Sequence, residues 1–174
     1  MAKLKSNHFN KKIFLPFFII FFIVIGIIGW YEIYQHFFSD RGIVQQNWNI
    51  DIEMPIQSKI IVDELGGLGL DGKLYTQYKY DKETIKKLVK QPYWIKVTKN
   101  NIKSVNQKVT DFTGLFIEYG NDDMKNKRDL LRHPIILNTN CYYYIKQDKE
   151  KPNEYAIFIL NPKENKLYLL EYYL

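Results

Sequence analysis

The sequence is poor in the residue types from which many catalytic and metal sites are built. Its 174 residues include one cysteine, Cys141, and three histidines. A single cysteine excludes an intrachain disulfide framework and a multi-cysteine zinc site. His133 is the only histidine after residue 50. Neither a histidine-dependent triad nor a metal site with two imidazole ligands is therefore expected in that part of the chain.

Charge is missing from residues 13–31, IFLPFFIIFFIVIGIIGWY. As a helix with about 1.5 Å rise per residue, this run spans roughly 28 Å, close to the roughly 30 Å thickness of the hydrocarbon core of a bilayer. We therefore predict a transmembrane helix over residues 13–34 that acts as a signal-anchor. Trp30 and Tyr31 end the apolar run, as expected of aromatic side chains at the outer headgroup level.

Acidic residues are missing from the leader, residues 1–12, which carries four lysines. By the positive-inside rule, this leader predicts a cytoplasmic N-terminus and a C-terminal domain outside the cell membrane. An exported domain without disulfides suits a bacterial cell envelope. The alternative is a cleavable signal peptide, whose apolar core is normally about 7–15 residues long and precedes small residues. Here the run is longer and bulky residues follow it, which favours the anchor.

The rest of the chain is nearly neutral. After the leader there are 21 basic and 19 acidic residues, so the net charge of +6 falls to +2. A nucleic-acid-binding face needs a concentrated basic patch, and the overall pattern here mixes both signs. We therefore expect no nucleic-acid partner.

The residues after the anchor are enough for one domain with a core of its own. We assign residues 35–49 to a juxtamembrane connector and residues 50–174 to an extracytoplasmic domain. Local patterns predict strands at 57–64, 73–80, 94–97, 114–119 and 141–145, a helix at 82–90 capped by Asp81, a loop or weak strand at 100–110, a short helix or loop at 121–132, and a terminal hairpin of 155–160 with 166–173. Strands with only one or two short helices favour an α+β fold with a mainly antiparallel sheet.

A glycine-rich segment follows the first predicted strand. Residues 67–72 match the pattern G-x-G-x-x-G, which binds dinucleotides only when a helix follows it. The next segment alternates as a strand does, so we predict a turn between two strands and no cofactor site. Gly66, Gly67, Asp71 and Gly72 form the candidate functional turn.

Three further candidates have a simpler structural explanation. Cys141 and His133 could form a thiol dyad, but Cys141 lies in an apolar strand pattern, where a buried inert thiol is commoner. Asp122 and Asp123 are adjacent in a lysine-rich segment, where carboxylates are usually solvated. We assign no catalytic residue and no metal ligand.

Tyrosine is abundant, with 14 in the chain. Tyr142, Tyr144, Tyr168 and Tyr172 lie in the last third and form the candidate binding surface, because tyrosine offers a large amphipathic contact area at low entropic cost. Tyrosine is also a good strand former, so a role in the core and on the ordinary surface is the alternative.

The order of these motifs resembles a family of small exported or membrane-anchored bacterial proteins. In that family a Gly-Gly-Phe-His-Gly-Asp-Gly turn precedes a final Leu-Tyr-Tyr-Tyr-Glu-Leu strand. This chain has GGLGLDG at 66–72, a predicted helix and Trp94, and LYLLEY at 167–172. Gly69 replaces the histidine of the family and Leu70 replaces a glycine, so a histidine-dependent role is not carried over. The resemblance implies an exported α+β domain and no particular reaction.

Together these observations predict a single-pass membrane protein whose external domain binds a protein or an envelope component. Immunity against a toxin would be one such role. The alternatives are an envelope hydrolase that uses carboxylates, with Asp71 as the first candidate, and a secreted protein released by cleavage.

Overall fold

The computed structural model describes residues 11–65, 71–118, 123–149, 151 and 153–174, and leaves the side chains of 11–18, 35, 36 and 123 outside the description. Over these ranges the chain has an α+β fold with five helices and a six-stranded antiparallel sheet. The predicted fold class is thus confirmed. The helical content is larger than the predicted one or two short helices beside the N-terminal one.

The sheet runs in the order β1-β2-β6-β5-β4-β3, and every neighbouring pair is antiparallel. Its strands are β1 (Gln57–Leu65), β2 (Gly72–Lys79), β3 (Ile95–Lys96), β4 (Tyr142–Gln147), β5 (Tyr155–Asn161) and β6 (Lys166–Tyr173). The predicted terminal hairpin is β5 paired with β6, and Asn165 takes a positive φ of 55° in its turn. This hairpin forms the centre of the sheet, because β2 and β4 pair with its outer sides.

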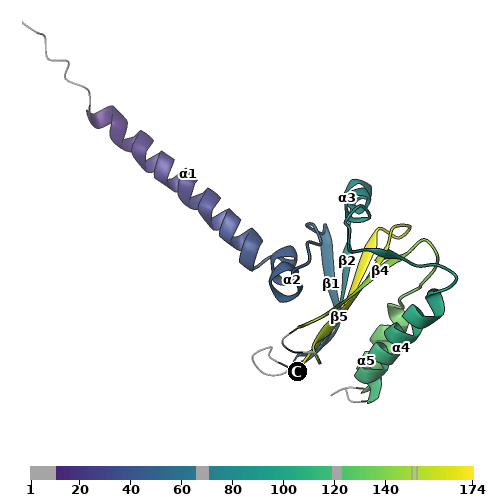
Figure 1. Cartoon of the computed structure of the whole chain (residues 1–174). Helices are drawn as coiled ribbons and strands as arrows, with labels where there is room; N and C mark the ends of the chain where they lie inside the picture. Colours follow the sequence, from purple (N-terminus) through teal and green to yellow (C-terminus); the bar gives the residue numbers. More distant parts are fainter. Residues whose placement is uncertain (1–10, 66–70, 119–122, 150, 152) are drawn as a thin grey trace, which may run out of the picture.

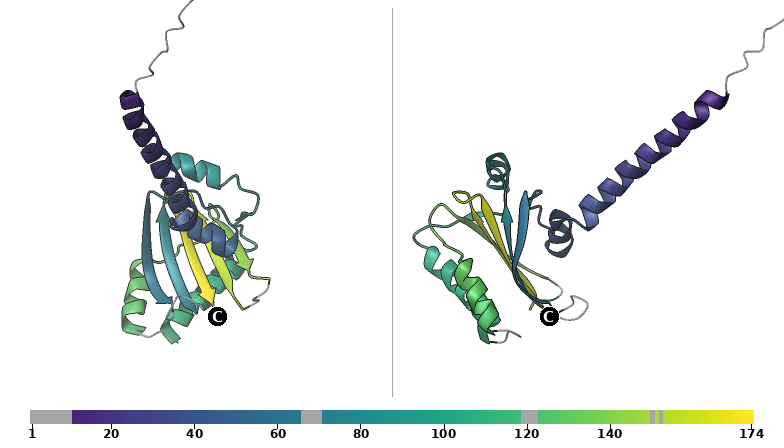
Figure 2. Two further views of the ribbon diagram at one scale, coloured as in Figure 1. Left: turned by 90° about the vertical axis from the view of Figure 1, so that its left-hand side faces the viewer. Right: turned by 180° about the vertical axis from the view of Figure 1, so that it is seen from behind.

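Helices cover both faces of the sheet (Figure 2). The helices α2 (Asp40–Trp48) and α3 (Lys82–Leu88) pack on one face, and α4 (Ile102–Glu118) and α5 (Asp123–Arg132) pack on the other. Along β5, Phe158 faces the α2–α3 layer, whereas Ile157 and Ile159 face the α4–α5 layer. Because both faces are buried, the central strands are apolar at nearly every position rather than at every second one.

The helix α1 (Lys11–Phe37) extends away from the sheet (Figure 1). Its described apolar side chains are largely exposed, from 47% at Val24 to 68% at Trp30. Among the side chains that the structure describes, no helix is both long and apolar enough to cross a membrane. The predicted span begins at Ile13, and the side chains of residues 13–18 are not among those that the structure describes.

A short turn separates α1 from α2. The amides of Phe38 and Ser39 both donate to the Tyr34 carbonyl, and the Ser39 hydroxyl caps α2 by accepting from the Gly42 amide at 3.0 Å. Residues 40–48, within the predicted connector, thus begin a new helix rather than a loop. Val44, at 1% exposure, lies four residues before the buried Trp48, so one side of α2 joins the core.

The two predicted elements that follow β2 along the chain are confirmed. The Asp81 carboxylate caps α3 by accepting from the Thr84 amide at 2.8 Å. After this helix, β3 is a two-residue strand at the edge of the sheet, inside the strand predicted at 94–97.

The predictions for residues 100–119 are wrong, because a loop or weak strand at 100–110 and a strand at 114–119 were expected. The described residues of both segments from Ile102 to Glu118 belong to the single helix α4. Its buried residues are Val105, Val109, Phe112 and Phe116, which recur at helical spacing and form one stripe against the sheet. Gly114, where the predicted strand was expected to begin, lies within the helix. The next helix, α5, confirms the helical alternative predicted for 121–132.

The strand β1 forms one edge of the sheet and is irregular. Its pairing with β2 shifts register between Ile60 and Val62, which places Ile61 in a bulge. Lys59 lies beside the bulge, and its Nζ contacts His133 Nε2 at 2.9 Å. A bulge and a charged side chain are common features of edge strands that do not pair further.

Candidate functional site

A pocket of about 320 Å³ lies on the α2–α3 face of the sheet, between α2 and the ends of three strands. Its polar lining comes from α2, from the segment before β5 and from β6, and consists of Asn47, Trp48, Lys151, Glu154, Glu171 and Tyr173. Leu65 and Leu74 complete it from β1 and β2. Concave sites with a few convergent polar groups are the usual places for ligand binding.

Glu171 is the central residue of this pocket. It is 3% exposed and follows Leu167 and Leu169 at strand spacing, so its carboxyl group lies on the α2–α3 face. Its Oε1 accepts hydrogen bonds from Trp48 Nε1 and from the Tyr173 hydroxyl, both at 2.6 Å. The contact with Trp48 ties α2 to the central hairpin. Within the described residues, no hydrogen bond is recorded for Oε2.

Burial perturbs the titration of this group. Loss of water contact raises the pKa of Glu171, and the hydrogen bonds from Tyr173 and Trp48 partly oppose that rise. Burial and the adjacent Glu171 also raise the pKa of Tyr173, whose hydroxyl oxygen accepts from Asn47 Nδ2 at 3.1 Å. A buried acid with a perturbed pKa that lines a pocket is a candidate functional group.

A second carboxylate stands at the rim. Glu154 is 7% exposed, and its Oε1 accepts from the ammonium group of Lys151 at 2.6 Å. This hydrogen bond is the main cause that raises the pKa of Lys151. The negative charge of Asp71 acts in the same direction. Asp71 is exposed and precedes Gly72, whose partner Leu65 lines the pocket. The pocket thus contains two carboxyl groups and one exposed cation that is already paired.

The described part of the candidate functional turn lies next to this pocket. Gly72 has a φ of +133° and pairs with Leu65, and a Cβ placed on it would lie 2.1 Å from the Glu64 carbonyl oxygen. Only glycine fits there. Gly66 and Gly67 lie outside the described residues. The structure therefore gives Gly72 a backbone role and leaves Asp71 exposed beside the pocket.

The four tyrosines of the candidate binding surface do not share a face. Tyr142 and Tyr144 pack against the α2–α3 layer. Tyr168 and Tyr172 pack on the α4–α5 side, where Tyr168 is 1% exposed and donates to Glu164 Oε2 at 2.7 Å. The four tyrosines do not form one surface, because the register aligns Tyr142 with Leu160 and Leu160 with Leu167, so the next residue, Tyr168, points to the other face.

The remaining candidates do not assemble into a site. Cys141 is buried, its Sγ lies 3.8 Å from the Ile136 carbonyl oxygen, and burial raises the pKa of its thiol, which confirms the predicted buried thiol. His133 contacts Lys59 instead, and burial together with the charge of Lys59 lowers its pKa. Asp122 and the side chain of Asp123 lie outside the description. Among the described residues, no group of three or more metal-ligating side chains occurs.

A buried polar cluster on the opposite face has a structural role. Lys73 Nζ lies 3.1 Å from Glu64 Oε2 and donates to the Leu115 carbonyl oxygen at 2.9 Å. Asn126 of α5 donates to Glu64 Oε1 and to the Phe116 carbonyl oxygen. A cation and an amide donor thus satisfy carbonyls at the end of α4 and hold the two helices on the sheet.

Sequence reasoning missed Glu171 and Trp48, although the sequence contains a signal for each. Glu171 is a charged residue at an inward position of an apolar strand, two residues after Leu169. Trp48 follows Val44 by four residues, which places both on one side of a helix. The pocket is acidic: Lys151 pairs with Glu154, and no cation pairs with Glu171 among the described residues. Its carboxyl groups can accept hydrogen bonds or hold a cation. No protein-family model, curated protein or solved structure matches this chain.

Proposed function

We propose that this chain is a single-pass membrane protein, N-terminus in the cytoplasm, whose external domain binds a cationic group of a protein or envelope component in the Glu171 pocket. The observation that carries the binding role is the buried carboxyl group of Glu171 in a pocket that also contains Glu154. An incoming ammonium or guanidinium group would meet two carboxyl groups there. Charge-assisted hydrogen bonds of this kind are roughly twice as strong as neutral ones.

The exposed apolar surface of α1 supports the membrane part of the proposal. Ile20, Phe22 and Ile27 are between 57% and 64% exposed, and the helix extends away from the domain (Figure 1). A continuous apolar surface of this kind is unfavourable in water and favourable in lipid. The lysine-rich leader sets the proposed orientation. Extraction only by detergent, together with protease cleavage of the domain from outside intact spheroplasts, is the expected behaviour.

The binding role is tested with two small probes of nearly equal shape, propylguanidinium and propylurea. The indole N–H resonance of Trp48 is the reporter, because this group contacts Glu171 directly. We expect propylguanidinium to bind about tenfold more tightly than propylurea, which corresponds to about 1.4 kcal/mol. Glu171→Gln should abolish this preference. Glu83→Gln, the same change on exposed α3, is the matched control and should keep it. Equal binding of both probes to the wild-type chain contradicts the proposal.

A hydrolase that uses carboxylates is the second candidate, because Glu171 and Glu154 line the same pocket. The raised pKa of Glu171 is the property required of a general acid. Asp71 is the weaker candidate, since it is exposed. Loss of envelope-degrading activity in Glu171→Gln at unchanged melting temperature would favour the enzyme. A secreted form remains the third alternative, and the mass of the mature chain tests it.

A further inference from the structure

The positive charge of the domain is concentrated in one segment. Residues 79–99 contain seven lysines and only two acidic residues, Asp81 and Glu83, which gives this segment a net charge of +5. Since the chain after the leader has a net charge of +2, its other residues together carry a net charge of −3. The mixture of signs in the whole sequence conceals this separation.

The lysines of α3 are available to an external partner. Only Ile85 and Leu88 of this helix are buried, and Lys82, Lys86, Lys87 and Lys90 are all exposed. Lys86 pairs with the exposed Glu83 at 2.8 Å. No other ion pair is recorded for these four lysines within the described residues. An exposed ion pair of this kind is weak, so it leaves Lys86 available to a partner. The charges of all four lysines therefore face solvent.

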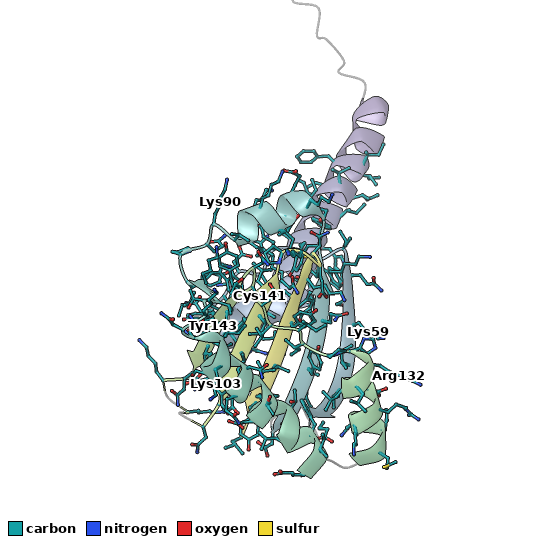
Figure 3. The ribbon with its side chains drawn as sticks, turned by 90° about the vertical axis from the view of Figure 1, so that its right-hand side faces the viewer. Lys59, Lys90, Lys103, Arg132, Cys141 and Tyr143 are labelled. Atoms are coloured by element: carbon teal, nitrogen blue, oxygen red, sulfur yellow. The ribbon has the colours of Figure 1, made fainter. Side chains whose placement is uncertain are left out.

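This basic helix lies on the side of the sheet from which α1 departs. Figures 1 and 2 show α3 over one end of the sheet, nearer to α1 than α4 and α5 are, and its buried residues belong to the same core cluster as those of α2. In Figure 3, Lys90 lies toward the α1 end of the domain, whereas Lys103 and Arg132 lie over α4 and α5. If α1 spans a bilayer, α3 is the basic helix nearest to the outer headgroups.

We propose that Lys82, Lys86 and Lys87 of α3, together with Lys90 in the turn that follows it, rest against anionic lipid headgroups of the membrane that holds α1. This inference depends on the proposed membrane anchor and is independent of the Glu171 pocket. Basic residues near a transmembrane helix are attracted to anionic lipid phosphates over about one Debye length. The anchor keeps the effective concentration of the surface high, so contacts that are individually weak suffice. Docking would fix the orientation of the domain above the lipid.

The test uses the full-length wild-type chain in nanodiscs and compares the acetylation rates of all lysines by mass spectrometry. One set of discs contains phosphatidylglycerol and the other contains phosphatidylcholine alone. We expect Lys82, Lys86, Lys87 and Lys90 to react several-fold more slowly in the anionic discs. Lys103, Lys108 and Lys127, exposed on α4 and α5, are internal controls and should react equally in both. At about 1 M salt the protection should disappear, because the Debye length falls to about 3 Å.

Two triple variants separate charge from position. Lys82→Gln/Lys86→Gln/Lys87→Gln should remove the protection of Lys90. The matched variant Lys103→Gln/Lys108→Gln/Lys127→Gln carries the same change of charge and should retain it. Equal α3 rates in both discs, or protection of α4 and α5 instead, would overturn the headgroup contact while leaving the anchor intact. Failure of the chain to enter the discs would overturn the anchor and, with it, this inference.

Discussion

The hydrogen bond between Trp48 and Glu171 makes a quantitative prediction. Trp48→Phe keeps most of the buried aromatic volume of a residue that is 2% exposed, and removes the indole N–H that donates to Glu171 Oε1 at 2.6 Å. A buried acceptor that loses its hydrogen-bond donor costs about 1–3 kcal/mol. We therefore expect the free energy of unfolding to fall by about 2 kcal/mol at neutral pH. For a domain of this size the melting temperature should fall by about 5–10 °C.

The dependence of this effect on pH follows from Glu171. Because its pKa is higher in the folded chain than the ordinary value of 4.5, the folded state binds the proton more tightly than the unfolded state. The stability that this proton contributes is fully present below pH 4.5 and is lost as the pH rises through the folded pKa. Glu171→Gln keeps an oxygen acceptor and cannot ionise. Relative to the wild type, it should therefore gain stability as the pH rises from 4.5 to neutrality.

Urea unfolding of the detergent-solubilised chain, followed by near-ultraviolet circular dichroism, measures both effects. The double variant Trp48→Phe/Glu171→Gln completes a double-mutant cycle, in which a coupling energy above about 0.5 kcal/mol marks a direct interaction. If Trp48→Phe changes the unfolding free energy by less than that, or if Glu171→Gln follows the wild type at every pH, the account of this pocket is wrong.

Three further predictions concern the fold, each read from urea unfolding. Lys73→Met should cost about 3–5 kcal/mol, because it leaves the Glu64 carboxylate buried without its cation. The double variant Lys73→Met/Glu64→Leu should recover most of that loss; failure to recover it would mean that the ion pair contributes net stability. Gly72→Ala should cost more than about 2 kcal/mol, because its φ of +133° and the adjacent Glu64 carbonyl exclude a Cβ; a neutral result would mean a different backbone. Asp81→Ala should cost about 1 kcal/mol through the lost cap on the Thr84 amide, whereas Asp81→Asn should cost little.

The strands could be predicted from the sequence because their signal is local. The apolar runs of β5 and β6, separated by a turn, specify a hairpin, and the alternation in β2 and the cap at Asp81 are equally explicit. The helix α4 is not evident from short windows, because polar residues separate its apolar ones. Its buried stripe, from Val105 to Phe116, emerges only over about three turns at the helical period.

The candidate site could not be predicted in the same way, because it depends on which strand faces which helix. Trp48 and Glu171 are 123 residues apart, and no local pattern pairs them. The tyrosine surface failed for the same reason, since Tyr144 and Tyr168 point to different layers. The described residues of the predicted functional turn, Asp71 and Gly72, lie at the same end of the sheet as the pocket, but their functional role stays a prediction. The charge of α3 was present in the sequence, but its significance depends on the position of that helix relative to α1.

The bulge at Ile61 has a consequence for chains that share one membrane. Confinement to a surface raises local concentration, and a straight outer strand would then template pairing from one molecule to the next, as in fibril growth. The shift of register between Ile60 and Val62 interrupts the regular spacing of donors and acceptors that such growth requires. If the proposed anchor holds many copies in one membrane, this irregular edge would keep their outer strands from pairing into a polymer.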